Sequence, residues 1–205
     1  MKKIKKMSVV LMITALVFSA CSRADNYNVY EKVYNCYNGM HAFRAEVAVT
    51  SYSNNSENKY TLTQYYKAPD KKRSEYVSEV GGSNVTVING NKGKIFSDYS
   101  SAPVELDIGH IEEKDYLMLS TFFDIYYSSE ETSVKTSGGE NKGSITLYAE
   151  TGSNNPYRKN IELVIDTKTL NPVKMTVLDT NGKPAICVEY LKFELNPQIE
   201  DSIFE

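Results

Sequence analysis

The chain has 205 residues, with 23 lysines and arginines against 26 aspartates and glutamates and a formal net charge of −3 at pH 7. This length predicts one domain with one substantial core. The acidic balance argues against nucleic acid, and against electrostatic attachment to anionic lipid. The 16 tyrosines, with no tryptophan, suit half-buried strand faces and binding surfaces alike.

The N-terminal residues predict export from the cytoplasm. Lysines at positions 2, 3, 5 and 6 precede an apolar run over residues 7–18, and no acidic residue lies before Cys21. This pattern is typical of a signal sequence, and the run is shorter than the roughly 20 apolar residues that span a bilayer. Ser19 and Ala20 lead into Cys21, which resembles the lipobox of bacterial lipoproteins, where the cysteine is acylated and the signal is cut before it. A signal cut elsewhere and an uncut anchor stay open as alternatives.

Acylation of Cys21, for example with palmitate, would hold the protein on a membrane, because each buried methylene contributes about 0.8 kcal/mol. We therefore expect a signal peptide over residues 1–20, a lipidated tether over 21–27 and a domain over 28–205. Loss of residues 1–20, which contain four lysines and no acidic residue, changes the formal charge from −3 to −7.

The domain begins with one amphipathic helix and continues with strands. Apolar residues recur at helical spacing from Val29 to Met40, and Asn28 with Glu31 forms a capping pair. Alternation then predicts strands, separated by turns rich in Gly, Asn and Pro. Ten strands are expected, within residues 42–52, 59–67, 68–80, 83–88, 94–99, 132–137, 143–150, 158–166, 172–179 and 185–196. Acidic residues followed by an apolar stripe predict a second helix over 111–127.

Ten strands form an antiparallel sheet too large to stay flat, so something must fill its concave face. The second helix carries suitable side chains: Leu117, Met118, Leu119, Phe122 and Phe123. The sequence therefore predicts an α+β fold, a curved antiparallel sheet or half-open barrel with helices packed in the concave face.

Three motifs together resemble the LolA, LolB and RseB superfamily of lipoprotein-related proteins. They are "YTLTQYYKAPDKKRSEY" (60–76), with Pro, basic residues and a strand-starting Arg; "VINGNKGKIFSDY" (87–99), with its Gly-containing turn; and residues 162–205, where Asp, Thr and Pro mark one hairpin, Asp and Gly the next, and Asn, Ile, Asp and Phe close the chain. The resemblance covers most of the mature domain and implies the LolA-like fold.

Within that superfamily the lipobox, the many Tyr and Asn residues and the acidic domain are similar to GerS-type germination lipoproteins. This resemblance implies a non-enzymatic protein that binds and activates a zinc-dependent N-acetylmuramoyl-L-alanine amidase of the CwlD type, so that the spore cortex is modified for germination. It also implies a location between the forespore membranes. The alternative is a lipid or lipoprotein carrier or acceptor of the LolA or LolB type, and an enzyme with an unfamiliar site is a third hypothesis.

No catalytic, cofactor-binding or metal-binding residue is predicted. His41 and His110 lack metal-ligand spacing, and we expect the acidic neighbours of His110 to be solvated: Asp107, Glu112 and Glu113. We expect Glu130 and Glu131 to be solvated as well.

Neither Cys36 nor Cys187 has the context of a nucleophile. They could form a disulfide or stay as two small apolar residues. The sequence does not identify the residues that contact a partner, although an open sheet edge could pair with a second copy to form a homodimer.

Overall fold

The computed structural model describes residues 28–53, 56–77, 82–108, 115–136 and 143–205. Cys21, His110, Glu112 and Glu113 therefore lie outside the described residues. The chain divides into two compact units, residues 1–38 and Gly39–Glu205. In the first unit, residues 28–38 form the predicted helix. The second unit holds every strand that the structure describes.

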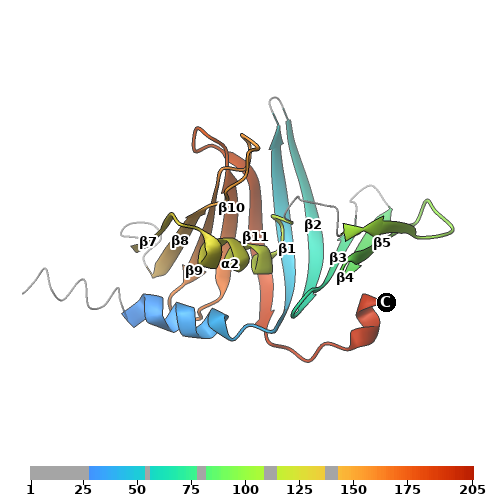
Figure 1. The fold of residues 1–205 in the computed structure, drawn as a ribbon, viewed down its shortest axis with the longest axis horizontal. Coiled ribbons are helices and arrows are strands. Elements are labelled where there is room, and N and C mark those ends of the chain that lie inside the picture. The colour runs from blue at the N-terminus through green and yellow to red at the C-terminus, as the bar shows by residue number, and fades with distance from the viewer. Residues whose placement is uncertain (1–27, 54–55, 78–81, 109–114, 137–142) are drawn as a thin grey trace, which may run out of the picture. The chain divides into compact units, whose positions relative to one another are not determined.

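The second unit is built on one sheet of eleven strands in the order β6-β5-β4-β3-β2-β1-β11-β10-β9-β8-β7 (Figure 1). Its strands are β1 Ala42–Ser53, β2 Ser56–Lys67, β3 Lys71–Val77, β4 Ser83–Asn89, β5 Lys92–Ser97, β6 Val104–Asp107, β7 Thr132–Thr136, β8 Ser144–Glu150, β9 Asn160–Asp166, β10 Pro172–Leu178 and β11 Pro184–Leu195. All neighbours are antiparallel. The sheet stays open because β6 and β7 form its two ends.

The first and last strands pair at the centre of the sheet. β1 lies between β2 and β11, with Phe43 opposite Tyr66 on one side and Leu195 on the other. Each half of the sheet is a meander of neighbouring strands, and the β1–β11 pair joins the halves. Ten strands correspond to predicted ones, but the number was wrong by one because Val104–Asp107 is only four residues long.

Alternating side chains give the sheet an inner face, which we define by Phe43, Val47, Leu62, Leu163 and Met175. Register places these residues on one side of neighbouring strands, and each is at most 6% exposed. Alternation follows from the two-residue period of a strand, so the intervening residues form the outer face.

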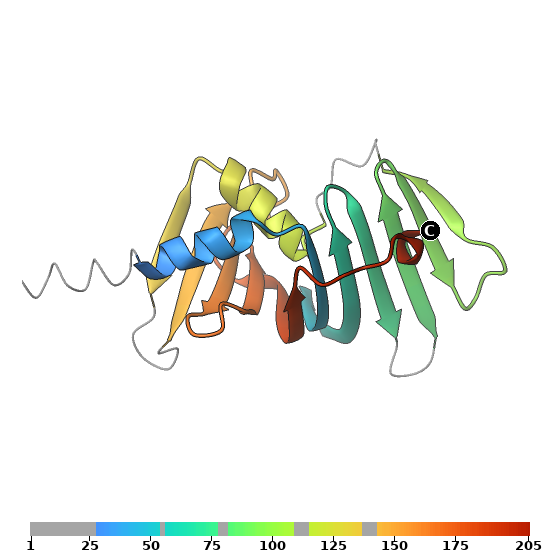
Figure 2. The same ribbon diagram turned by 90° about the horizontal axis from the view of Figure 1, so that it is seen from below.

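Helix α2, Leu119–Ser128, covers the inner face on the side of β8. Figure 2 shows the helix crossing this half of the sheet. The predicted filling is confirmed for Met118, Leu119, Phe122 and Phe123, which are at most 4% exposed. Leu117 is only half-buried. The predicted fold class, an α+β fold with an open antiparallel sheet and helical filling, is thus confirmed.

The second helix, predicted over residues 111–127, begins at Leu119, after a turn over residues 115–118. Residues 111–114 of that prediction lie outside the described residues. The Asp115 side chain accepts a hydrogen bond from the Leu117 amide at 3.1 Å, and the Asp115 carbonyl accepts one from the Met118 amide at 3.2 Å. An aspartate that bonds to the backbone two residues on stabilises a turn in competition with a helix.

Candidate functional site

The C-terminal motif residues stabilise turns. Between β9 and β10, the Asp166 carboxylate accepts hydrogen bonds from the Lys168 and Thr169 amides at 2.9 and 2.7 Å. Between β10 and β11, Asp179 accepts from the Asn181 and Lys183 amides, both at 2.8 Å. These hydrogen bonds lower the pKa of both carboxyls. The motif thus identifies hairpins, and backbone hydrogen bonds explain both aspartates without a ligand.

The basic motif of β2 and β3 holds the C-terminal tail. Asp201 accepts from the Lys67 ammonium at 2.7 Å and lies 3.2 Å from that of Lys71, and the Arg73 guanidinium donates to the Ile203 carbonyl at 3.1 Å. The 3₁₀ helix η2, Asp201–Phe204, contacts β3 and β4, where its end is marked in Figure 2. Phe204 is 1% exposed, so the tail is part of the fold.

The motif asparagine ties the two central strands together. The Asn196 side-chain oxygen accepts from the amides of His41 at 2.9 Å and Ala42 at 3.2 Å, and its amide nitrogen donates to the Gly39 carbonyl at 3.3 Å. The His41 ring is exposed and its Nδ1 lies 3.4 Å from the same Gly39 carbonyl. His41 therefore sits at a structural junction.

The described residues contain no group of three or more His, Cys, Asp or Glu side chains that could hold a metal ion. Cys36 and Cys187 are free thiols, so the structure contains no disulfide between them. Glu130 and Glu131 are exposed in the turn after α2. In the part of the chain that the structure describes, no helix is long and apolar enough to cross a membrane.

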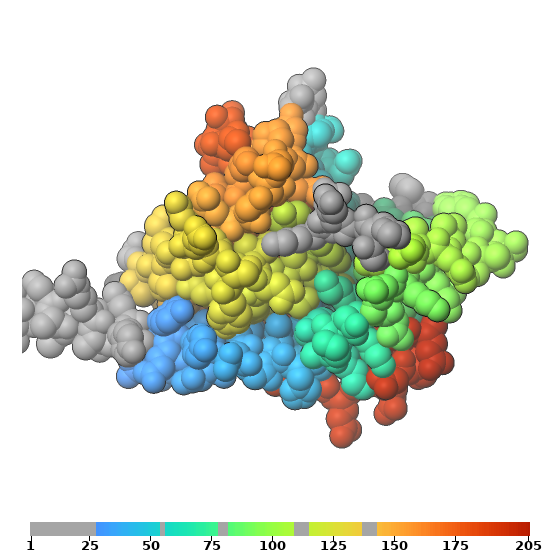
Figure 3. Space-filling view, in the orientation of Figure 1, coloured from blue at the N-terminus to red at the C-terminus, as the bar shows by residue number. Residues whose placement is uncertain are grey.

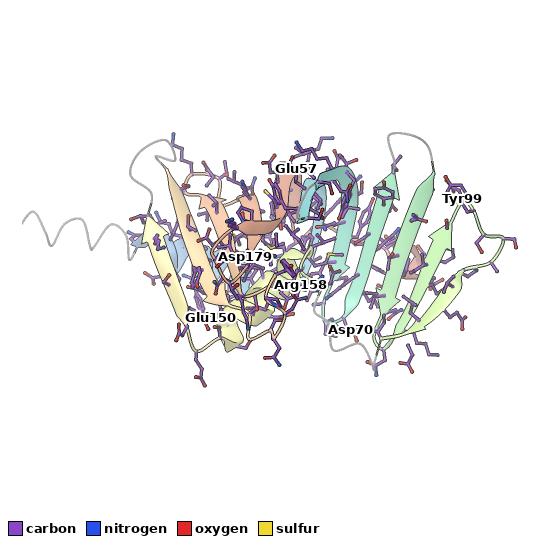
Figure 4. The ribbon with its side chains drawn as sticks, turned by 90° about the horizontal axis from the view of Figure 1, so that it is seen from above. Glu57, Asp70, Tyr99, Glu150, Arg158 and Asp179 are labelled. Atoms are coloured by element: carbon purple, nitrogen blue, oxygen red, sulfur yellow. The ribbon has the colours of Figure 1, made fainter. Side chains whose placement is uncertain are left out.

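A polar cleft of about 810 Å³ lies between the end of α2 and the loop after β8. Glu130, Glu131 and Glu150 line it, and the Arg158 guanidinium stacks over the Tyr116 ring at 5.3 Å. In Figure 3 the atoms of α2 and of this loop adjoin, and Figure 4 labels Glu150 and Arg158. The three carboxylates are exposed, so water solvates their charges.

A second hollow, which we call the inner groove, has a volume of about 630 Å³. It lies on β2, β3 and β4, beyond the part of the inner face that α2 covers. Its lining includes Tyr60, Ser74, Tyr76, Asn84, Thr86 and Asp115. The rings of Tyr60 and Tyr76 meet edge to face with centroids 5.4 Å apart. The groove therefore combines aromatic surface with hydrogen-bonding groups.

Asp115 carries the negative charge of the inner groove. Burial raises the pKa of its carboxyl, while the Leu117 amide and the charge of Lys72 act in the opposite direction. The lining contains one cation, Lys59, whose ammonium is paired with Glu57 at 3.2 Å. Sequence reasoning missed this groove because its residues come from three strands and the turn before α2.

The two end strands offer unpaired backbone edges. All five residues of β7 are exposed, and so are three of the four in β6. Each strand pairs with one neighbour in the described sheet. Such an edge can accept another strand, so the edges are candidate surfaces for a protein partner.

Comparisons with known proteins give one family and several structures. The model of a family described as "Sporulation protein YdcC-like" matches residues 1–204. A chain in the structure of the CwlD amidase from Clostridioides difficile in complex with the GerS lipoprotein is 29% identical, with a TM-score of 0.49 over 82% of this chain and 94% of that one. None of the curated proteins matches.

Two further structures are more distant in sequence. An uncharacterized conserved protein from Thermus thermophilus is 14% identical, with a TM-score of 0.53 over 87% of this chain and 92% of that one. A LolA superfamily protein from Nitrosomonas europaea is 12% identical, with a TM-score of 0.44 over 88% and 97%. The Thermus similarity shows a shared fold.

Proposed function

We propose that this chain, which belongs to the sporulation protein YdcC-like family, is a non-catalytic lipoprotein that binds and activates a cell-wall amidase. The lipobox, the many Tyr and Asn residues and the acidic domain are similar to GerS-type lipoproteins, and this resemblance points to an N-acetylmuramoyl-L-alanine amidase of the CwlD type. The family points to spore formation as the setting. The activated amidase would then modify the cortex that germination enzymes recognise.

The observation that carries this proposal is the filling of the inner face. A carrier of the LolA type needs an empty apolar cavity, whereas Leu119 and Phe122 of α2 are completely buried against the sheet. Close packing leaves no space for an acyl chain among such side chains. A partner protein instead needs exposed surface, which β6 and β7 provide.

The carrier remains the second candidate because one hollow stays open. The inner groove of about 630 Å³ includes Leu62 and Leu117 beside its polar residues. A fixed acceptor could place part of a lipid there. The binding experiment therefore has to detect lipid as well as amidase.

Native mass spectrometry of the chain from Ser22, mixed with the amidase of the same organism, tests the proposal. We expect a mass equal to both chains together and no lipid on the free protein, with amidase activity on cortex glycan rising when the two are mixed. No complex at tens of micromolar, or a lipid adduct that the amidase cannot displace, would contradict it.

Two matched substitutions test which edge of the sheet binds the amidase. Val134 in β7 and Val104 in β6 are 40% and 55% exposed. Val134→Lys and Val104→Lys each add a charge at one end of the sheet without disturbing the core. If an edge binds the amidase, only the variant at that edge loses the complex; if both retain it, docking occurs elsewhere. A homodimer through these edges stays a prediction, which light scattering tests.

Membrane anchoring through Cys21 is part of the proposal. Each acyl chain contributes about 0.8 kcal/mol per buried methylene, so two chains keep the protein at the outer surface of a membrane, between the forespore membranes in a sporulating cell. Metabolic labelling with palmitate should mark the natural protein. Cys21→Ala should abolish the label and release the protein from membranes, and a labelled Cys21→Ala protein would place the lipid elsewhere.

A further inference from the structure

We propose that the inner groove binds a short, uncharged oligosaccharide of amino sugars, through the rings of Tyr60 and Tyr76 and the polar side chains of β3 and β4. This binding would belong to the protein itself and needs no amidase. The choice of amino sugars as the ligand class rests on the proposed function, because the glycan strand is what such an amidase acts on.

The groove floor consists of side chains arranged in two cross-strand rows. Leu62, Tyr76 and Asn84 face one another across β2, β3 and β4 in one row, and Ser74 faces Thr86 in the next. Opposite residues in neighbouring antiparallel strands lie within about 5.5 Å of each other. Aromatic, amide and hydroxyl groups therefore meet within the area of a few sugar rings.

The floor of the inner groove carries polar side chains. Ser74, Asn84 and Thr86 are half-buried, and their side chains form no hydrogen bond with another described residue. Half-buried hydroxyl and amide groups without a protein partner bond to water, which a ligand can displace. Together they supply donors and acceptors on one side of the groove, which matches the ring of hydroxyls around a pyranose.

The aromatic pair supplies the apolar contact that a sugar needs. Tyr60 and Tyr76 are both half-buried, and their rings are inclined at 79°. In this edge-to-face arrangement one ring presents its face beside the edge of the other. The C–H groups on one side of a pyranose form a flat apolar surface that can pack on such a face, while its hydroxyls reach the polar rows.

The charges of the groove disfavour anionic ligands. Asp115 lies in the lining, and the one lining cation, Lys59, is already paired with Glu57. A phospholipid head group or a phosphate would meet the Asp115 carboxylate, and the charge of Lys72, outside the lining, already acts on that carboxylate. Sugar hydroxyls, in contrast, can donate to that carboxylate, which accepts one hydrogen bond among the described residues, from Leu117.

The backbone of the floor disfavours an extended peptide. β2, β3 and β4 each pair on both sides, so their amides and carbonyls are already bonded. Strand addition requires a free edge, and the groove offers only side chains. Its volume of about 630 Å³ lies within the range of roughly 300–1,000 Å³ that is typical of small-ligand sites.

The test is a titration of the purified full-length protein with chitotriose, in a zwitterionic detergent that has no sugar head group. We expect saturable binding by calorimetry and by ligand-observed NMR, and weaker binding of cellotriose, which lacks the acetamide groups. No chitotriose binding at millimolar concentration would overturn the proposal. Displacement of chitotriose by a neutral phospholipid, added as mixed micelles with the same detergent, would overturn it as well.

Matched variants locate the binding. Tyr76→Leu should weaken chitotriose binding by roughly tenfold, the effect of losing one aromatic contact of about 1.4 kcal/mol, whereas Tyr76→Phe keeps the ring and most of the affinity. The control Tyr99→Leu removes a tyrosine, labelled in Figure 4, that is 84% exposed and is not part of the groove lining. Equal losses in Tyr76→Leu and Tyr99→Leu would refute the site.

A second variant separates binding from folding. Asp115→Asn should weaken chitotriose binding without lowering the stability of the protein, because it removes a buried charge. Amidase binding by native mass spectrometry is measured on the same variants. If the saccharide fails to bind while the amidase complex forms, the further inference is wrong and the proposed function stands; the opposite pattern contradicts only the proposed function.

Discussion

Replacing Phe122 by alanine tests whether α2 is a fixed part of the core. The Phe122 side chain is completely buried, and its ring lies 5.2 Å from that of Phe123 and 5.8 Å from that of Tyr126. Truncation of a buried phenylalanine removes its transfer free energy and leaves a cavity, at a cost of about 3–5 kcal/mol. Since a domain is stable by roughly 5–15 kcal/mol, Phe122→Ala should lose a large part of its stability.

Urea unfolding of the chain from Ser22 measures this loss. We expect a lower midpoint with an unchanged slope, and a melting temperature lower by about 10 °C. Asp124→Ala is the control, because Asp124 is exposed on the same helix and its removal should change stability by at most about 0.5 kcal/mol. A loss below about 1 kcal/mol in Phe122→Ala would refute the argument, since α2 would then be a loosely held lid and the carrier hypothesis would regain its cavity.

Three further outcomes follow from the same structure. Asp115→Asn should raise stability to urea at pH 7. Burial raises the folded pKa of Asp115 above its ordinary 3.8, so the native state loses stability as pH rises from 3.8 to the folded pKa. Equal urea midpoints of the variant and the natural protein at pH 7 would contradict this. Asp166 and Asp179 have lowered folded pKa values, so their contribution is complete above pH 3.8 and is lost as pH falls through the folded values; a double Asp→Asn variant should show a flatter acid limb. Phe204→Ala should cost about 3 kcal/mol, the lower end for a buried phenylalanine because a chain end can relax, and a thermal melt unchanged from the natural protein would show that the tail does not stabilise the sheet.

Most strands were predictable because their signals are local. Alternation in β1 places Phe43, Ala45 and Val47 on one face, and the Asp166 and Asp179 turns carry the residues that bond to their own backbone. The short strand β6 was missed, since four residues give too few alternations. The start of α2 was placed too early because the turn at Asp115 competes with the helix over a few residues only.

The candidate binding groove could not be read from the sequence. Tyr60, Tyr76 and Thr86 are separated along the chain and become neighbours only when β2, β3 and β4 pair in register. Whether a ligand can reach their polar groups also depends on how much of the inner face α2 covers. These are properties of side chains facing one another across strands, which no local pattern contains.

The sequence by itself determined the strands, the turns and the apolar stripe of the second helix, because each depends on neighbours a few residues apart. Only the tertiary structure decided that the first and last strands, β1 and β11, pair at the centre of the sheet. It also decided that α2 fills one part of the inner face and leaves the groove open. Those features arise from contacts between distant residues, whose order is set by how the whole sheet buries its apolar surface.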